Sequence, residues 1–158
     1  MRVGIGYDVH RLVGGRKLFL GGIEISFHKG LQGHSDGDVL LHAICDALLG
    51  AISEGDIGIH FPDTDESIKG IESINILSYV ARLLKEKGFR VINIDVVVAA
   101  EEPKIYPYRK LICEKIAGIL DIEAGQVGIK GKTTEGLGFT GRKEGIAAYA
   151  VALVEEHL

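Results

Sequence analysis

Hydrophobic residues recur at two different spacings in this chain of 158 residues, and the two spacings alternate along it. Apolar residues at every second position are typical of strands, whereas apolar residues three and four apart are typical of helices. The clearest strand signal alternates and then becomes wholly apolar; it is FRVINIDVVVAAE (89–101), with the alternating residues Ile92, Ile94, Val96 and Val98. Strands separated by helices predict an α/β or α+β domain of two layers.

Three helices are predicted from apolar residues at helical spacing, in segments 38–51, 71–88 and 108–122. Either Asp36 or Asp38 can cap the first helix. Further strands are predicted at 2–12 and 126–135, with a hairpin around Gly21-Gly22. The last segment, 144–158, is ambiguous, because its alanines favour a helix while its glycine boundary and the strand before it favour another strand.

Composition narrows the class of protein. The net charge of −4 argues against a broad nucleic-acid surface, and no run of 18 apolar residues is present to span a membrane. No signal peptide is recognisable, and Cys45 and Cys113 lack C-x-x-C spacing. We therefore expect one cytoplasmic domain, 1–158, with reduced, buried thiols. The 22 glycines, about twice the usual share of ~7%, predict tight turns and close backbone approaches.

An aspartate and a histidine lie two residues apart in GYDVHRL (6–12). Residues two apart on a strand share a face, so Asp8 and His10 project together while Val9 is expected to point into the core. A carboxylate and an imidazole suit zinc, whose catalytic sites often use three protein ligands and keep one position open. For this pair alone, an exposed strand face is the better explanation.

A second polar cluster supplies a candidate third ligand. His42 lies among apolar residues of the first predicted helix, and Asp46, one turn later, could orient its imidazole. The alternative is a partly exposed histidine with an acidic neighbour. Because Asp8 and His10 need a third ligand, we interpret His42 as that ligand. The other polar residues of this cluster are His34, Ser35, Asp36 and Asp38.

The glycine-rich stretch GIKGKTTEGLGFTGR (128–142) combines lysines, hydroxyls and backbone amides, which suit phosphate oxygens. It lacks the residue order of a P-loop. Glu135 fits an anion site only if it binds a cation that bridges phosphates, as magnesium does. The alternative is an ordinary glycine turn with solvated charges.

Two further stretches carry weaker signals. In AAEEPKIYP (99–107), Lys104 follows a strand end where small alanines would let a flat ring approach the backbone. In GDIGIHFPDTD (55–65), acidic residues and His60 lie on a loop that could close over a ligand. A surface turn and a solvated acidic loop are the respective alternatives.

Together these stretches resemble the 2-C-methyl-D-erythritol 2,4-cyclodiphosphate synthase family of the non-mevalonate isoprenoid pathway. The resemblance runs from residue 4 to beyond 150 in the family's order and spacing. It rests on G-Y-D-V-H-R, H-S-D-G-D-x-x-x-H, D-A-L-L-G-A, G-D-I-G, F-P-D-T-D, P-K and T-T-E-G-L-G-F-T-G-R-x-E-G-I-A.

The resemblance implies an α+β two-layer sandwich, with a four-stranded mixed sheet and helices on one face. The ambiguous segment 144–158 then becomes a strand. The resemblance also implies a homotrimer with active sites between subunits, and an axial cavity that can hold an isoprenoid diphosphate.

Individual roles follow from the same resemblance. Asp8, His10 and His42 match the ligands of a divalent cation, usually zinc, and Glu135 matches the ligand of a magnesium or manganese ion on the substrate diphosphate. His34 and Thr133 match positions of transition-state stabilisation. Positions that contact substrate are Ser35, Asp56, Ile57, Gly58, Phe61, Asp63 and Asp65 for the erythritol and phosphate parts, Ala100, Pro103, Lys104, Ile105, Tyr106, Lys132 and Thr134 for the cytidine and diphosphate, and Phe139 and Arg142 near the threefold axis.

The implied enzyme is a phosphorus–oxygen lyase. The 2-phosphate of 4-diphosphocytidyl-2-C-methyl-D-erythritol 2-phosphate attacks the β-phosphorus of the same molecule, CMP leaves, and 2-C-methyl-D-erythritol 2,4-cyclodiphosphate forms. A phosphate monoester has a second pKa of about 6 and is largely ionised near neutral pH, so no general base is required. Charge neutralisation by cations and positioning then dominate the barrier.

Two rival functions use the same residues. A zinc phosphohydrolase with this triad would release free phosphate in place of CMP. A non-catalytic trimeric module would use the metal only to join subunits and the glycine loop to bind an isoprenoid or a nucleotide. The sequence disfavours both rivals, because a structural zinc site is normally closed by a fourth ligand. No fourth ligand is evident, although His34 is a candidate.

Overall fold

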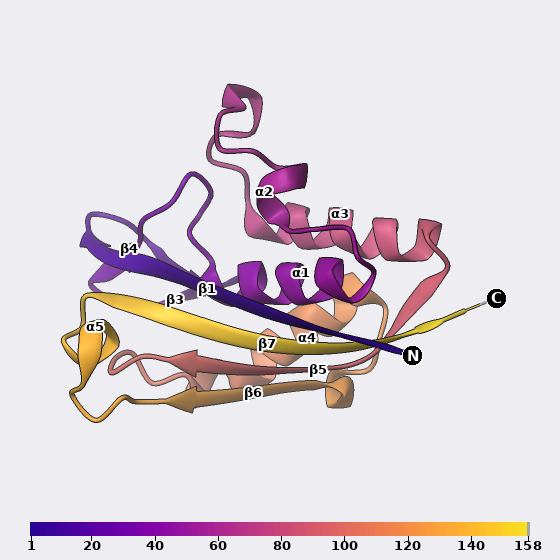
Figure 1. Ribbon diagram of the computed structural model, residues 1–158. Coiled ribbons are helices and arrows are strands. Elements are labelled where there is room, and N and C mark those ends of the chain that lie inside the picture. The colour runs from indigo at the N-terminus through magenta and orange to yellow at the C-terminus, as the bar shows by residue number, and fades with distance from the viewer. Residues whose placement is uncertain (158) are drawn as a thin grey trace.

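A twisted mixed sheet forms one layer of the domain and helices on one of its faces form the other (Figure 1). The computed structural model describes residues 1–157. The α+β architecture expected from the sequence is confirmed. In spatial order the strands are β4 (Lys29–Leu31), β1 (Arg2–Gly14), β7 (Gly145–Glu156), β5 (Phe89–Ala99) and β6 (Val127–Lys132).

The sheet has five strands where four were expected. The additional strand, β4, pairs antiparallel with the end of β1, with Leu31 opposite Leu12. Three residues are too few to show an alternating pattern, which explains why the sequence did not reveal β4. The predicted hairpin is present as a separate pair of strands, β2 (Leu18–Leu20) and β3 (Ile23–Ile25).

The ambiguous C-terminal segment is the central strand β7, as the family resemblance implied. It pairs antiparallel with β1 on one side and with β5 on the other. Its buried residues facing the helical layer include Ala148, Ala150 and Ala152. These small side chains leave room for a helix to pack close to the strand, so the alanines serve helix–sheet packing and not a helix of their own.

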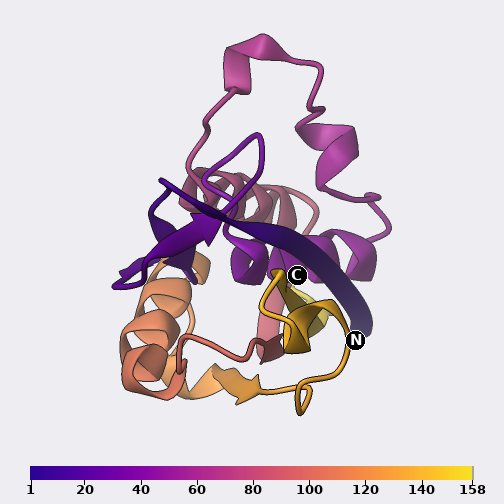
Figure 2. The same cartoon turned by 90° about the vertical axis from the view of Figure 1, so that its left-hand side faces the viewer.

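The three predicted helices are present. They are α1 (Val39–Ala51), α3 (Ser73–Glu86) and α4 (Arg109–Leu120). Shorter helical turns are α2 (Ile57–His60), α5 (Gly138–Gly141), η1 (Glu66–Ile68), η2 (Tyr106–Tyr108) and η3 (Ala124–Gln126). The segment that carries α2 and η1 stands out from the helical layer in both views (Figure 2).

Asp38, and not Asp36, caps α1. Its buried carboxylate accepts hydrogen bonds from the backbone N–H of Leu41 and from those of Gly21 and Gly22 in the hairpin turn. Burial raises the pKa of Asp38, although these N–H donors oppose that shift. One carboxylate thus fixes both the start of α1 and the position of the hairpin beside it.

The predicted alternation in β5 is wrong at Ile92. The pairing with β7 shifts register between Val91 and Asn93, as expected where a strand carries one extra residue. Val91 and Ile94 are buried, while Ile92 between them is only half-buried. The bulge therefore turns Ile92 away from the face it would share with Ile94 in a regular strand.

The two faces of β1 have opposite characters. Gly4 and Gly6 face α1, and a Cβ on Gly6 would lie 1.9 Å from the backbone oxygen of Ala43. Asp8 and His10 continue this face toward the start of α1. The expectation that Val9 enters the core is wrong, because Val9 is 40% exposed on the opposite face, which no helix in the described part of the chain covers.

Candidate active site

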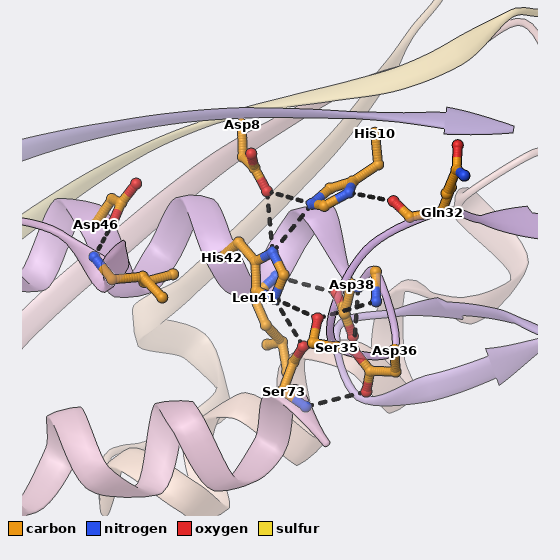
Figure 3. A network of polar contacts seen from close by, with 12 residues as sticks. Asp8, His10, Gln32, Ser35, Asp36, Asp38, Leu41, His42, Asp46 and Ser73 are labelled. Carbon is orange, nitrogen blue, oxygen red and sulfur yellow. Dashed lines mark hydrogen bonds and ion pairs between the residues drawn. The ribbon is translucent and has the colours of Figure 1, made fainter. Parts of the chain in front are cut away.

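Asp8, His10 and His42 converge at the point where β1 passes the first turn of α1 (Figure 3). Asp8 Oδ2 lies 2.9 Å from His10 Nε2 and 3.0 Å from His42 Nδ1, and these two nitrogens are 3.2 Å apart. The strand alternation places the first two residues, and the helix start set by Asp38 places the third. The predicted grouping of these three side chains is confirmed.

The donor set fits a divalent cation. His10 Nδ1 lies 2.5 Å from the Gln32 carbonyl oxygen, which can only accept, so this nitrogen carries the hydrogen and Nε2 offers its lone pair to the cluster. Two imidazole nitrogens and a carboxylate oxygen within 4.8 Å of one another are the ligand types that zinc prefers. A cation between them would relieve the repulsion of facing lone pairs.

The electrostatics of the cluster favour an ionised carboxylate. Burial disfavours the charge on Asp8, but hydrogen bonds and charge interactions with His10 and His42 outweigh burial and lower its pKa to about 2. For His10, burial favours the neutral ring, but Asp8 and the Gln32 carbonyl outweigh it and raise its pKa. The Asp8 carboxylate and the His10 imidazole therefore stabilise each other's charged forms.

The three residues open into a cavity of about 410 Å³. This cavity brings together most of the residues predicted to contact the erythritol and phosphate parts of the substrate. Asp56 is not on its wall; it caps α2 by accepting from the Ile59 N–H and so positions that turn. The predicted residues that line the cavity with the triad are His34, Ser35, Ile57, Gly58, Phe61, Asp63 and Asp65.

The residues predicted to contact cytidine line a different cavity, of about 400 Å³, beside β5 and β6. Because β6 and β1 lie on opposite sides of β7 and β5 in the sheet, one chain does not join the two cavities. Glu135 and Thr134 lie just beyond this second group, on the loop after β6. The predicted residues on its wall are Ala100, Pro103, Lys104, Ile105, Tyr106, Lys132 and Thr133.

Two expectations about individual residues need correction or a new explanation. Asp46 does not orient His42; its Oδ1 accepts from the Ile57 N–H at 2.9 Å, and burial raises its pKa. His60 is held by Tyr79 Oη at 2.9 Å and the Glu54 carbonyl at 2.8 Å. Both residues therefore anchor the segment that carries α2, which forms one wall of the cavity.

Phe139 and Arg142 were expected near a threefold axis. Phe139 lies in α5 and is 37% exposed. Arg142 donates from Nε to Glu144 Oε1 at 2.9 Å, and this ion pair raises the pKa of the guanidinium. Neither residue lines the cavity that contains the triad. Their predicted role requires a partner chain.

Comparison with known proteins decides the family. The model described as "YgbB family" matches residues 1–155. The chain belongs to the YgbB family. The resemblance proposed from the sequence is confirmed by relatives that are named 2-C-methyl-D-erythritol 2,4-cyclodiphosphate synthase.

Two of these relatives cover nearly the whole chain. The protein from Caldicellulosiruptor bescii is 61% identical over 155 residues, which are 98% of this chain and 99% of the relative. The protein from Alkaliphilus metalliredigens is 60% identical over 158 residues, which are 100% of this chain and 99% of the relative. The solved structure named "IspF (Plasmodium falciparum) CDP complex" matches with a TM-score of 0.88 and 36% identity, covering 99% of this chain and 97% of that one.

Sequence reasoning did not find the contacts that two residues of this YgbB-family site make. Ser73 is fully buried and lies 2.9 Å from His42 Nε2, although 31 positions separate them. Glu101 accepts from the backbone N–H groups of Thr134 and Gly136, and so holds the loop on which Glu135 has a φ of 54°. Neither contact has a local sequence signal, because each joins segments that meet only in the fold.

Within residues 1–157, no helix of this YgbB-family chain is long and apolar enough to cross a membrane. Cys45 and Cys113 are both free and buried, as expected from their spacing.

Proposed function

We propose that this chain converts 4-diphosphocytidyl-2-C-methyl-D-erythritol 2-phosphate to 2-C-methyl-D-erythritol 2,4-cyclodiphosphate and CMP. The observation that carries the proposal is the convergence of Asp8, His10 and His42 at the wall of an open cavity. Relatives about 60% identical over the whole chain bear the name of this synthase, which supports the assignment of the reaction.

The chain's own residues have roles of binding and positioning. Asp8, His10 and His42 would hold a zinc ion, and Glu135 would hold a magnesium or manganese ion. When bound, such cations supply positive charge that neutralises phosphate oxygens. His34 and Ser35 on the first cavity wall and Thr133 on the second would offer hydrogen bonds to the reacting phosphates.

Positioning suffices because the reaction is intramolecular. The attacking phosphate is already ionised near neutral pH, so the chain needs no base to activate it. Holding two reacting groups in line can contribute about 7–11 kcal/mol in favourable systems. The cavity residues on α2 and on the loop after it would fix the erythritol, and the residues beside β6 would fix the cytidine diphosphate.

We also propose that three copies assemble with active sites between them. The sheet face opposite the helices exposes apolar side chains on two adjacent strands, including Ile5, which is 73% exposed. Contiguous apolar patches of this kind are typical of interfaces. A neighbouring copy would cover this face and bring its cytidine-site cavity to the triad cavity. The other exposed apolar residues are Val3, Tyr7, Val9, Tyr149 and Val151.

The proposal has three further parts: a ligand on the threefold axis, a single domain and a cytoplasmic location. Phe139 and Arg142 would face the threefold axis, where an isoprenoid diphosphate could bind; native mass spectrometry of the trimer with that ligand tests this. Residues 1–158 would act as one domain. A charged nucleotide substrate and buried free thiols favour a cytoplasmic location.

The test is an assay of the purified protein with substrate, zinc and magnesium. Release of CMP together with the cyclic diphosphate supports the synthase, whereas free phosphate would select a phosphohydrolase. The variant His42→Ala should keep its fold but lose zinc and nearly all turnover, because one of three ligands is gone. His28→Ala removes an exposed histidine outside both cavities and should behave like the wild type. Normal cyclisation by His42→Ala would refute the assignment of His42.

A further inference from the structure

The two ring nitrogens of His42 face different surroundings. Nδ1 lies toward Asp8 and His10, while Nε2 points into a buried polar site beneath α1 (Figure 3). Two hydroxyl groups lie within hydrogen-bond distance of Nε2, Ser73 Oγ at 2.9 Å and Ser35 Oγ at 3.1 Å. For Nδ1 to offer a lone pair to a cation, a neutral ring must carry its hydrogen on Nε2. The hydroxyl that accepts this hydrogen therefore matters for metal binding.

Ser73 has its own hydrogen committed to a carboxylate. Its Oγ makes a short hydrogen bond with Asp36 Oδ1, and its backbone N–H donates to Asp36 Oδ2 at 3.0 Å. An ionised carboxylate can only accept, so the hydroxyl hydrogen of Ser73 points toward Asp36. The lone pairs of Ser73 Oγ are then left for His42. Ser73 is fully buried, so bulk water does not compete for these contacts.

Ser35 cannot set the same direction by itself. Its Oγ accepts from the Gly37 N–H at 3.1 Å, and within residues 1–157 it has no hydrogen bond to a carboxylate. Its hydroxyl hydrogen is therefore free to turn toward His42 Nε2, which would favour the opposite tautomer. Of the two serines, only Ser73 has its hydroxyl hydrogen directed by Asp36, so only Ser73 is fixed as an acceptor toward His42.

We propose that Asp36 and Ser73 are positioning residues, which direct the hydrogen of His42 to Nε2 and hold Nδ1 toward the metal. The order of hydrogen bonds is His42 Nε2–H to Ser73 Oγ, and Ser73 Oγ–H to Asp36. Hydrogen-bond partners of this kind on metal-binding histidines fix ring orientation and raise ligand basicity. The inference rests on the proposed metal role of His42.

The same contacts couple the metal site to the start of α3. Glu72 occupies the N-cap position of that helix but makes no capping hydrogen bond with its side chain. Asp36, from the loop before α1, takes this role by accepting the Ser73 N–H. One carboxylate thus fixes both the first residue of α3 and the imidazole on α1, and a change at Asp36 affects both.

The experiment separates these two effects by changing Ser73. In Ser73→Ala the backbone N–H still caps α3 through Asp36, but the link to His42 is lost. Ser78→Ala is the matched control, because it removes a hydroxyl on the same helix that, among residues 1–157, bonds only to the Ile74 carbonyl. Zinc affinity of metal-free protein is measured by competition with a chromophoric chelator. We expect a 10- to 100-fold loss for Ser73→Ala and a change within about twofold for Ser78→Ala.

A spectroscopic readout distinguishes positioning from a general loss of structure. In ¹⁵N NMR of the zinc-loaded protein, wild type and Ser78→Ala should show one His42 Nε2–H signal that is protected from solvent exchange. Ser73→Ala should lose this protection. Ser73→Thr retains the hydroxyl and should restore zinc affinity.

Asp36→Asn keeps the inference testable if Ser73→Ala does not fold. Its amide keeps the side-chain shape but must turn a donor group toward either the N–H or the Oγ–H of Ser73, so zinc affinity should fall here too. Unchanged zinc affinity and an unchanged His42 signal in either folded variant would overturn the positioning role, while the proposed function would stand. If the wild type itself binds no zinc, the proposed metal site and this inference both fail.

Discussion

Replacing Gly6 with alanine tests whether the close approach of β1 to α1 sets the geometry of the metal site. A Cβ at this position would lie 1.9 Å from the Ala43 oxygen and 2.9 Å from the Ala47 nitrogen, both backbone atoms of α1. Backbone atoms cannot rotate away as a flexible side chain can. Reaching even 3.0 Å from the Ala43 oxygen requires the strand and helix to separate by about 1.1 Å.

This separation of β1 from α1 would directly move the proposed metal ligands Asp8 and His42. Gly6 is two residues before Asp8, and Ala43 follows His42, so a shift at this contact changes the 3.0 Å separation of Asp8 Oδ2 from His42 Nδ1. Overpacking of this kind typically costs about 1–3 kcal/mol in stability. A misplacement of about 1 Å at a reacting site can reduce turnover by about 100-fold.

Gly14→Ala is the matched control. Gly14 lies on the same strand, but a Cβ there would meet no atom within 4 Å. Its substitution should change stability little, or raise it by about 0.4–1 kcal/mol by restricting the unfolded chain. Urea unfolding of the metal-free proteins, zinc affinity and CMP release measure the three effects. If Gly6→Ala matches Gly14→Ala in all three, the argument that this contact positions the ligands is wrong.

Two other predictions concern charge and assembly. The Asp8 carboxyl has a pKa of about 2 against an ordinary 3.8. In the metal-free protein, its ionised form therefore contributes about 2 kcal/mol to the free energy of unfolding above pH 4, and this contribution is lost as the pH falls toward 2. The difference in unfolding free energy between wild type and Asp8→Asn should therefore shrink below pH 4, and a difference independent of pH would contradict the assigned cause. In the proposed trimer, Ile5→Glu places a charge on the apolar sheet face and should yield monomers by sedimentation, with CMP release reduced at least tenfold because the two cavities would no longer meet. Monomers with full turnover would show that one chain suffices.

Local patterns in the sequence determined most of the helical layer and part of the site. The spacing of apolar residues predicted α1, α3 and α4. In the structure, α3 and α4 bury one side, while α1, which packs against both the sheet and α3, is buried on nearly all sides. Strand alternation placed Asp8 and His10 on one face. The position of His42 among the apolar residues of the first predicted helix suggested it as the third ligand, and the family resemblance agreed. These inferences succeeded because each depends on residues close together in the chain or on a matched motif.

The alternation on β1 also shows where such reasoning stops. It separates the residues of the strand into two sets but does not say which set a helix will cover. Packing of α1 against Gly4 and Gly6 decided this, and left Val9 on the uncovered face. The expectation that Val9 lies in the core was therefore wrong, although the sequence correctly placed Val9 and Asp8 on opposite faces of the strand.

Only the tertiary structure decided which distant segments complete each element and each contact. Strand pairing with β1 and β5 made β7 a central strand, and the bulge at Ile92 became visible only against that partner. The contacts from Asp36 through Ser73 to His42 join a loop and two helices. Hydrogen bonds and backbone approaches of this kind depend on the relative placement of whole elements, which periodicity along one segment does not encode.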